Sequence, residues 1–178
     1  MARITSQRTR GRMLQAALLA AVLSSWLPSA LPAATIILVR HAERSAAMSA
    51  DALLAPAGEE RAILLAQILK DAAIQRIYVT EVRRTQQTAE PSAAKLHLTP
   101  IVIPQSDTDA LVSQLQKLGD EETALVVGHA NTVPLIVERL GAGPAPAMPD
   151  AEYDRLTVVF TANGKARAVT LRYGAVAE

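Results

Sequence analysis

The sequence contains no cysteine among its 178 residues. That absence excludes disulfide bonds, thiolate metal sites, cysteine-based phosphatase chemistry and a lipid anchor attached through an N-terminal cysteine. The chain also has no internal repeat and only one proline-rich stretch, at 141–149. Half of the residues are hydrophobic, so we expect the protein to be held together by an ordinary apolar core.

A long hydrophobic run is missing as well. The apolar run Met13–Leu27 has 15 residues, fewer than the roughly 20 that a spanning helix needs. Four arginines precede it and small residues with prolines follow it, which is the order of a secretory signal peptide. We therefore predict a signal peptide at 1–34, cleaved after Ala33 or Ala34, with an uncleaved N-terminal anchor as the alternative. The mature protein is then expected to be periplasmic or secreted, without stable membrane association.

An excess of positive charge is missing from the mature part. The formal net charge is +1, but four of the 18 Lys and Arg lie in 1–34 and none of the 17 Asp and Glu do. The remaining 14 basic residues against 17 acidic ones give residues 35–178 a charge of −3. A basic surface that binds nucleic acid is therefore not expected.

Strand patterns alternate with helix patterns beyond residue 35. Strands are predicted at Ile36–Val39, Ile77–Thr80, Thr99–Ile103 and Ala124–Val127, and helices at 58–73, 83–95, 107–118 and 132–140. The last apolar runs, Leu156–Thr161 and Ala166–Tyr173, flank Asn163-Gly164, a strong hairpin signal. This order predicts one α/β domain at 35–178, a three-layer α/β/α sandwich with a mainly parallel sheet and a C-terminal antiparallel hairpin.

Imidazole and guanidinium side chains follow three of the predicted strands. Arg40 and His41 come after the first strand, Arg83 and Arg84 after the second and His129 after the fourth. Ligands bind beyond the carboxyl ends of the strands in an open α/β sheet, so we expect these side chains to face one cleft. Two helices begin there, the second with Asn131 as its predicted N-cap, and helix N-termini attract anions. The sequence therefore predicts an anion site.

Four segments in this domain carry a family resemblance. They are Leu38–Arg44, Leu54–Gly58, Thr80–Ala89 and Val126–Asn131. The first resembles the Arg-His-Gly signature of the histidine phosphatase superfamily, also called phosphoglycerate mutase-like, with Ala42 in place of the glycine. The others resemble the superfamily's Leu-Thr-x-x-Gly helix entry, its Ser-Pro-Leu-x-Arg-Ala-x-Gln-Thr-Ala segment and its second histidine motif.

The resemblance implies a phosphatase that acts on a small phosphorylated substrate without a metal or a cofactor. His41 would attack phosphorus and form a phosphohistidine, which water then hydrolyses. His129 is expected to donate a hydrogen bond to the phosphoryl group as an imidazolium. Guanidinium groups would neutralise the phosphoryl oxygens in place of a metal. The phosphate-binding residues implied in this way are Arg40, Arg44, Arg84, His129 and Asn131.

The motifs do not fix the group that protonates the leaving oxygen. One branch of the family uses an aspartate directly after the second histidine, where this chain has Ala130. The remaining candidates are Glu81, Asp107 and Asp109, in that order, although Asp107 would also suit a helix cap. If none of them serves, substrates with good leaving groups, such as phosphohistidine or phosphoramidates, become favoured.

Other functions stay open beside this one. The Asp107-Thr108-Asp109 segment has the Asp-x-Asp form of metal-dependent aspartyl phosphatases. A mutase is disfavoured, because a mature domain of 144 residues leaves little room for the inserts that mutases carry. A non-catalytic phosphate- or partner-binding module and a phosphohistidine-protein phosphatase are the remaining alternatives. We assign no site role to His97, and we expect Tyr153 to serve in packing.

Overall fold

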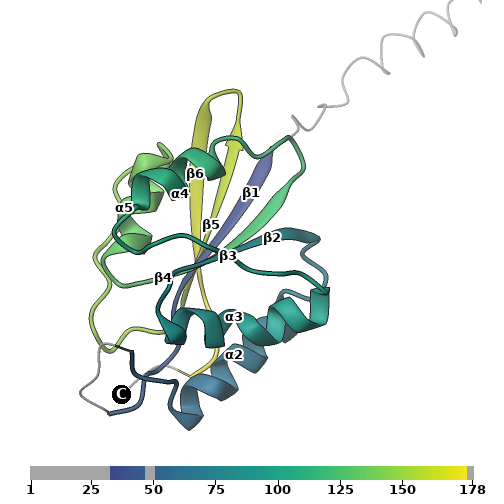
Figure 1. Cartoon of the computed structure of the whole chain (residues 1–178). Coiled ribbons are helices and arrows are strands. Elements are labelled where there is room, and N and C mark those ends of the chain that lie inside the picture. The colour runs from purple at the N-terminus through teal and green to yellow at the C-terminus, as the bar shows by residue number, and fades with distance from the viewer. Residues whose placement is uncertain (1–32, 47–50, 176–178) are drawn as a thin grey trace, which may run out of the picture. The chain divides into compact units, whose positions relative to one another are not determined.

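The computed structural model describes residues 33–46 and 51–175. The predicted signal peptide lies outside this range except for Ala33 and Ala34, and Ala34 is already the first residue of a strand. A six-stranded sheet in the order β3-β2-β4-β1-β5-β6 forms the centre of the domain (Figure 1). Its strands are β1 (Ala34–Arg40), β2 (Ile74–Val79), β3 (Ile101–Val102), β4 (Thr123–Gly128), β5 (Arg155–Ala162) and β6 (Lys165–Arg172).

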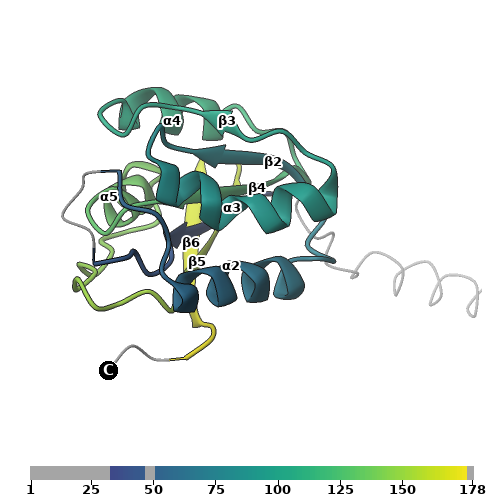
Figure 2. The same cartoon turned by 60° about the horizontal axis from the view of Figure 1, so that its bottom comes forward.

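Helices cover both faces of this sheet. The helices α2 (Pro56–Ile68) and α3 (Arg83–Leu96) lie on one face, and α4 (Thr108–Leu115) and α5 (Thr132–Arg139) lie on the other (Figures 1 and 2). Each face has its own hydrophobic cluster, one including Leu65 of α2 and the other including Ile136 of α5. The predicted three-layer sandwich is therefore confirmed. Within the described ranges, no helix is long and apolar enough to span a bilayer.

The pairing of the strands also matches the predicted mixture. The strands β1, β2, β3 and β4 pair in parallel, whereas β5 runs antiparallel to both β1 and β6. The β5–β6 hairpin turns at Asn163 and Gly164, whose φ angles of 51° and 71° are both positive. A two-residue hairpin loop of type I′ has positive φ at both positions, which asparagine and glycine tolerate best.

The register between β1 and β4 positions the functional end of the sheet. Arg40 at the end of β1 pairs with Gly128 at the end of β4. The residues that follow, His41 and His129, therefore leave neighbouring parallel strands at the same level. The backbone N–H of His41 continues the pairing by donating to the carbonyl oxygen of Gly128 at 2.9 Å.

Element boundaries differ from the prediction by several residues. The helix predicted at 58–73 begins at Pro56 and ends at Ile68, because the chain turns through Ala73, with φ of 49°, into the longer β2. The helix predicted at 107–118 ends at Leu115. The strand β3 has only two residues, but it lies at the sheet edge, where Pro100 and Pro104 favoured it.

The glycine of the second motif has a packing reason. A Cβ atom on Gly58 would overlap the carbonyl oxygen of Glu43, which lies two residues after His41. The same carbonyl oxygen accepts a hydrogen bond from the N–H of Ala55 at 2.9 Å. The first turn of α2 therefore packs backbone against backbone on the segment that follows the nucleophile candidate, which only glycine permits.

We predict that Gly58→Ala lowers the free energy of unfolding by about 1–3 kcal/mol, because the new methyl group must displace backbone rather than a flexible side chain. Urea denaturation of the purified domain measures this change. Gly119→Ala is the matched control, since its Cβ would meet only the Glu122 carboxylate at 3.4 Å, and its effect should stay within about 0.5 kcal/mol. Equal stabilities of the two variants would contradict the close approach at Gly58.

Candidate active site

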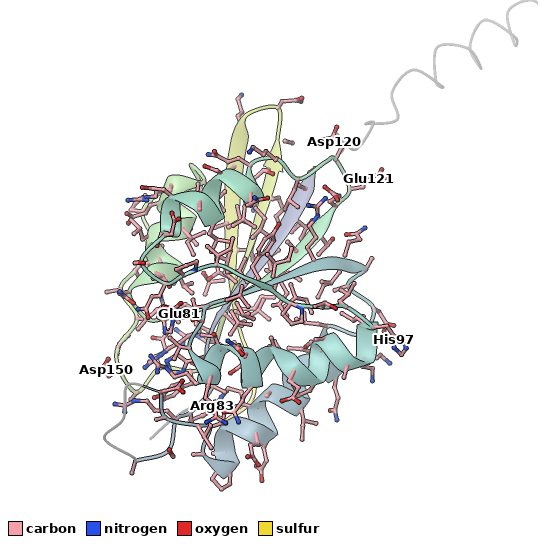
Figure 3. The ribbon with its side chains drawn as sticks, viewed as in Figure 1. Glu81, Arg83, His97, Asp120, Glu121 and Asp150 are labelled. Atoms are coloured by element: carbon pink, nitrogen blue, oxygen red, sulfur yellow. The ribbon has the colours of Figure 1, made fainter. Side chains whose placement is uncertain are left out.

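A cavity of about 460 Å³ opens beyond the carboxyl ends of the parallel strands. Its walls come from segments that are far apart in the chain, and Figure 3 labels Glu81, Arg83 and Asp150 at this end of the domain. The residues that line it are Arg40, His41, Arg44, Val82, Arg84, Gln105, His129, Ala130, Asn131, Asp150 and Tyr153. Every residue predicted to bind phosphate is in this set, whereas the three predicted proton donors, Glu81, Asp107 and Asp109, are not.

His41 has a fixed orientation and protonation state. The side chain is 4% exposed, and its Nδ1 lies 2.8 Å from the carbonyl oxygen of Ala42. A carbonyl oxygen can only accept, so Nδ1 carries the proton and Nε2 holds the free lone pair of the neutral ring. Burial, with the nearby charges of Arg84 and Arg40, lowers the pKa of His41 to about 3. The ring is therefore neutral at physiological pH.

His129 lies beside His41, with 5.4 Å between the ring centroids. Its Nδ1 is 3.5 Å from Nη2 of Arg84, which can only donate, and its Nε2 is 3.1 Å from the hydroxyl oxygen of Thr80. The neutral ring therefore donates from Nε2 to Thr80. Burial and the charge of Arg84 lower the pKa of His129 to about 4. Burial and the neighbouring arginines therefore favour the neutral ring over the predicted imidazolium in this structure.

Arg40 connects the cavity to the loop that follows α5. Its Nη1 donates to the carbonyl oxygens of Pro149, Asp150 and Glu152 at 3.1, 2.8 and 3.1 Å. Its guanidinium carbon lies 4.2 Å from the ring centroid of Tyr153, a cation–π contact. The Nε of Arg40 is buried and has no hydrogen-bond partner among the described residues. A bound anion could accept a hydrogen bond from this unsatisfied cationic donor.

Arg84 brings a second guanidinium from the first turn of α3. Burial lowers the pKa of Arg84, and repulsion from Arg44 and Arg40 lowers it further. Arg44 lines the same cavity from an exposed position, whereas Arg83, which is also exposed at this end of the domain, does not line it. Three arginines thus share one cavity, and among the described residues that line it Asp150 is the one acidic residue. The cavity has an excess of positive charge.

Threonines of the third motif fix the segments that carry these groups. The buried hydroxyl of Thr88 accepts from the N–H of Ala42 at 2.9 Å and donates to the carbonyl oxygen of Arg84 at 2.7 Å. Thr85 accepts from the N–H of Thr80 at 3.1 Å and joins the hydroxyl of Thr80 at 3.0 Å. One helix face therefore connects β1, β2 and the pocket arginine. The pattern of the third motif alone did not predict this role for its threonines.

Asn131 occupies the predicted N-cap position of α5, but its side chain makes no capping hydrogen bond. It is exposed and lines the cavity. The N–H groups of Thr132 and Val133 instead donate to the carbonyl oxygen of His129 at 3.1 and 3.0 Å. The start of α5 therefore holds the backbone of the second histidine, and the amide of Asn131 is available to a ligand.

The candidates for the proton donor lie outside the cavity lining. The Glu81 carboxylate accepts from the N–H of Gln105 at 2.8 Å. Asp107 caps α4 by accepting from the N–H of Ala110 at 3.0 Å, and Asp109 is paired with Arg139. Each of these carboxylates therefore has a structural contact of its own.

Two lining residues were missed by the sequence analysis. Tyr153 was expected to serve only in packing, but its ring stacks on Arg40 and lies 6.0 Å from the ring of His41. Asp150, which directly follows the proline-rich stretch 141–149, had no predicted role. Neither residue belongs to a motif. The one sequence signal for them is a long loop that contains acidic and aromatic residues.

Two further observations bound the site. His97 lies at the far end of α3, away from Glu81 and Asp150 in Figure 3, so the third histidine has no place in the cavity. Across residues 33–46 and 51–175, there is no group of three or more His, Cys, Asp or Glu that could hold a metal ion.

Comparisons with known proteins agree with this geometry. The model of the histidine phosphatase superfamily, branch 1, matches residues 36–108, which include three of the four motifs. No curated protein matches the sequence. The match confirms the resemblance to the histidine phosphatase superfamily that the motifs predicted, and the following structures show the fold.

Several solved phosphatase structures share the fold of nearly the whole domain. The α-ribazole phosphatase of Shigella flexneri superposes with a TM-score of 0.66 at 16% identity, over 80% of this chain and 98% of its own. The protein histidine phosphatase SixA, complexed with tungstate, gives 0.63 at 22% identity over 78% and 96%. The mycobacterial glucosyl-3-phosphoglycerate phosphatase gives 0.62 at 13% identity over 80% and 99%.

The buried neutral histidines make stability depend on pH. Their pKa values are about 3 and about 4 in the folded chain, against 6.5 in an exposed imidazole. The unfolded chain therefore binds more protons at acidic pH, so the stabilisation is complete above pH 6.5 and is lost as the pH falls towards 3. In phosphate-free buffer we predict a loss of about 2 kcal/mol for each histidine between pH 7 and pH 5.

Urea denaturation at the two pH values measures this loss. His129→Gln keeps a donor for Thr80 but cannot titrate, so it should lose about half as much stability as the wild type over the same range. An identical loss in both proteins would show that His129 titrates normally in the folded state.

Proposed function

We propose that this protein is a phosphatase that hydrolyses a phosphomonoester through a phosphohistidine on His41. The observation that carries the proposal is the 2.8 Å contact between Nδ1 of His41 and the carbonyl oxygen of Ala42. It leaves Nε2 unprotonated in a cavity that three arginines line. A neutral imidazole has the lone pair that attack on phosphorus requires, and its low pKa keeps it neutral at physiological pH.

The arginines supply the electrostatic part of the reaction. Phosphoryl transfer depends mainly on positioning and on neutralising the phosphoryl oxygens. Arg84, Arg44 and Arg40 line the cavity and offer donors to those oxygens, and the buried Nε of Arg40 has no other partner among the described residues. A bound phosphate would relieve the mutual repulsion that lowers the pKa of Arg84.

His129 has a protonation state that depends on the ligand in this proposal. In the empty site the ring is neutral and accepts from Arg84. A phosphate dianion beside the ring favours the imidazolium, because an opposite charge raises the pKa of a base. Binding then takes up a proton, and Nδ1 of His129 donates to the phosphoryl group.

A phosphoramidate substrate, including phosphohistidine on a protein, is the second candidate. Ala130 stands where one branch of the family has its acid, and Glu81, Asp107 and Asp109 have other contacts. A leaving nitrogen that is already protonated needs no acid from the enzyme. SixA, named as a protein histidine phosphatase, is among the similar structures. Comparing rates on phosphoramidate and on p-nitrophenyl phosphate separates the two substrate classes.

The test of the proposed function uses p-nitrophenyl phosphate and a matched pair of histidine variants. His41→Asn removes the nucleophile and should lower kcat/KM by roughly 1,000-fold or more. His97→Asn makes the same change at the exposed end of α3 and should retain the wild-type rate. Equal rates in the wild type and His41→Asn would leave only the non-catalytic binding module.

The phosphohistidine intermediate and the metal independence of the reaction are each tested by a separate measurement. Acid quenching followed by neutralisation should reveal phosphate on His41 that is acid-labile and base-stable, the signature of phosphohistidine. Incubation with EDTA should leave the rate unchanged. Loss of activity in EDTA would favour the metal-dependent alternative.

A further inference from the structure

The proposed reaction lacks a proton source for the leaving oxygen among the residues that the motifs identify. A positioned acid contributes about 10² to 10⁴ to such reactions when the leaving group is poor. Glu81, Asp107 and Asp109 each contact a structural partner and do not line the cavity. Asp150 is the one acidic residue among the described residues that line it.

The backbone of Asp150 is fixed to the phosphate-binding end of the site. Its carbonyl oxygen accepts from Nη1 of Arg40 at 2.8 Å, between the contacts to Pro149 and Glu152. Arg40 is thus surrounded by the loop on one side and borders the cavity on the other. Because only the carbonyl oxygen of Asp150 makes this bond, its carboxylate is not needed to hold the loop.

A second arginine, Arg155, binds the backbone of the same loop on the N-terminal side of Asp150. Arg155 donates to the carbonyl oxygens of Pro146 and Ala147 at 2.7 and 3.1 Å, and its guanidinium pairs with Glu152. Glu152 in turn pairs with Arg172. The loop is therefore anchored on both flanks of Asp150, which suits a side chain that must meet a substrate at a set position.

We propose that Asp150 donates the proton to the leaving group and afterwards activates the hydrolytic water. This inference rests on the proposed phosphatase function and adds the residue that the four motifs lack. An ionised Asp150 beside a phosphate dianion would bring two negative charges together. The complex with substrate therefore favours a proton shared between Asp150 and the phosphate group.

The two steps balance in atoms and charge. In the first step Nε2 of His41 forms a bond to phosphorus while the bond from phosphorus to the leaving oxygen breaks. The electron pair of that bond stays on the leaving oxygen, which takes the proton of Asp150. In the second step the Asp150 carboxylate accepts a proton from water as the water oxygen bonds to phosphorus, and the electron pair of the P–N bond returns to His41.

Leaving-group dependence tests this assignment. Asp150→Asn keeps the carbonyl oxygen that Arg40 binds, so the loop contact is preserved. On an alkyl phosphate, whose leaving oxygen must be protonated, kcat/KM should fall by about 100-fold. On 2,4-dinitrophenyl phosphate, whose anion leaves unaided, the loss should be less than about threefold.

Matched variants distinguish a failure of the Asp150 assignment from a failure of the proposed phosphatase function. Asp120→Asn, at the opposite end of the domain from Asp150 in Figure 3, should retain wild-type rates on both substrates. A selective loss in Glu81→Gln instead of Asp150→Asn would make Glu81 the donor and overturn the proposal. Equal losses on both substrates, or none on either, would reduce Asp150 to a wall of the cavity. If His41→Asn also retains activity, the proposed function has failed rather than the assignment of Asp150.

Discussion

Positive charge concentrated around two buried imidazoles is the constraint on which this site depends. Three arginines line one cavity with His41 and His129, each of which is 4% exposed. Burial, and after it the repulsion from neighbouring cations, lowers the pKa values of Arg84 and both histidines. Bringing these groups together is therefore electrostatically unfavourable without an anion, and the fold must hold them against that repulsion.

The surrounding contacts supply that restraint. The parallel register of β1 and β4 fixes the two histidines side by side, and the N–H of Ala42 is held by Thr88 of α3. Behind the cavity, the buried Arg61 binds the Glu43 carboxylate through Nε and Nη2 at 2.7 to 3.0 Å and donates to the carbonyl oxygen of Tyr173. The segment after His41 is thereby joined to α2 and to the C-terminal strand. Partners outside the cavity hold the shape, so the groups inside remain available to a ligand.

Features that depend on strand order and local pattern were predictable from the sequence. The alternation of apolar runs gave the parallel sheet, and residues just past strand ends had to meet at one edge, which identified Arg40, His41 and His129. Loop contacts and burial were not predictable in this way. Tyr153 and Asp150 approach Arg40 across more than a hundred residues without any periodicity, and the neutrality of His129 follows from burial that no pattern records. The signal peptide stays a prediction.

The most direct test of the account is a crystal structure of the protein with orthovanadate, which mimics a phosphoryl group under attack. We expect vanadium bonded to Nε2 of His41, with guanidinium groups of Arg40 and Arg84 and Nδ1 of His129 contacting the vanadate oxygens. Vanadate bound away from His41, or a His41 ring turned so that Nδ1 faces the vanadate, would contradict the claim that Nε2 of His41 is the nucleophile.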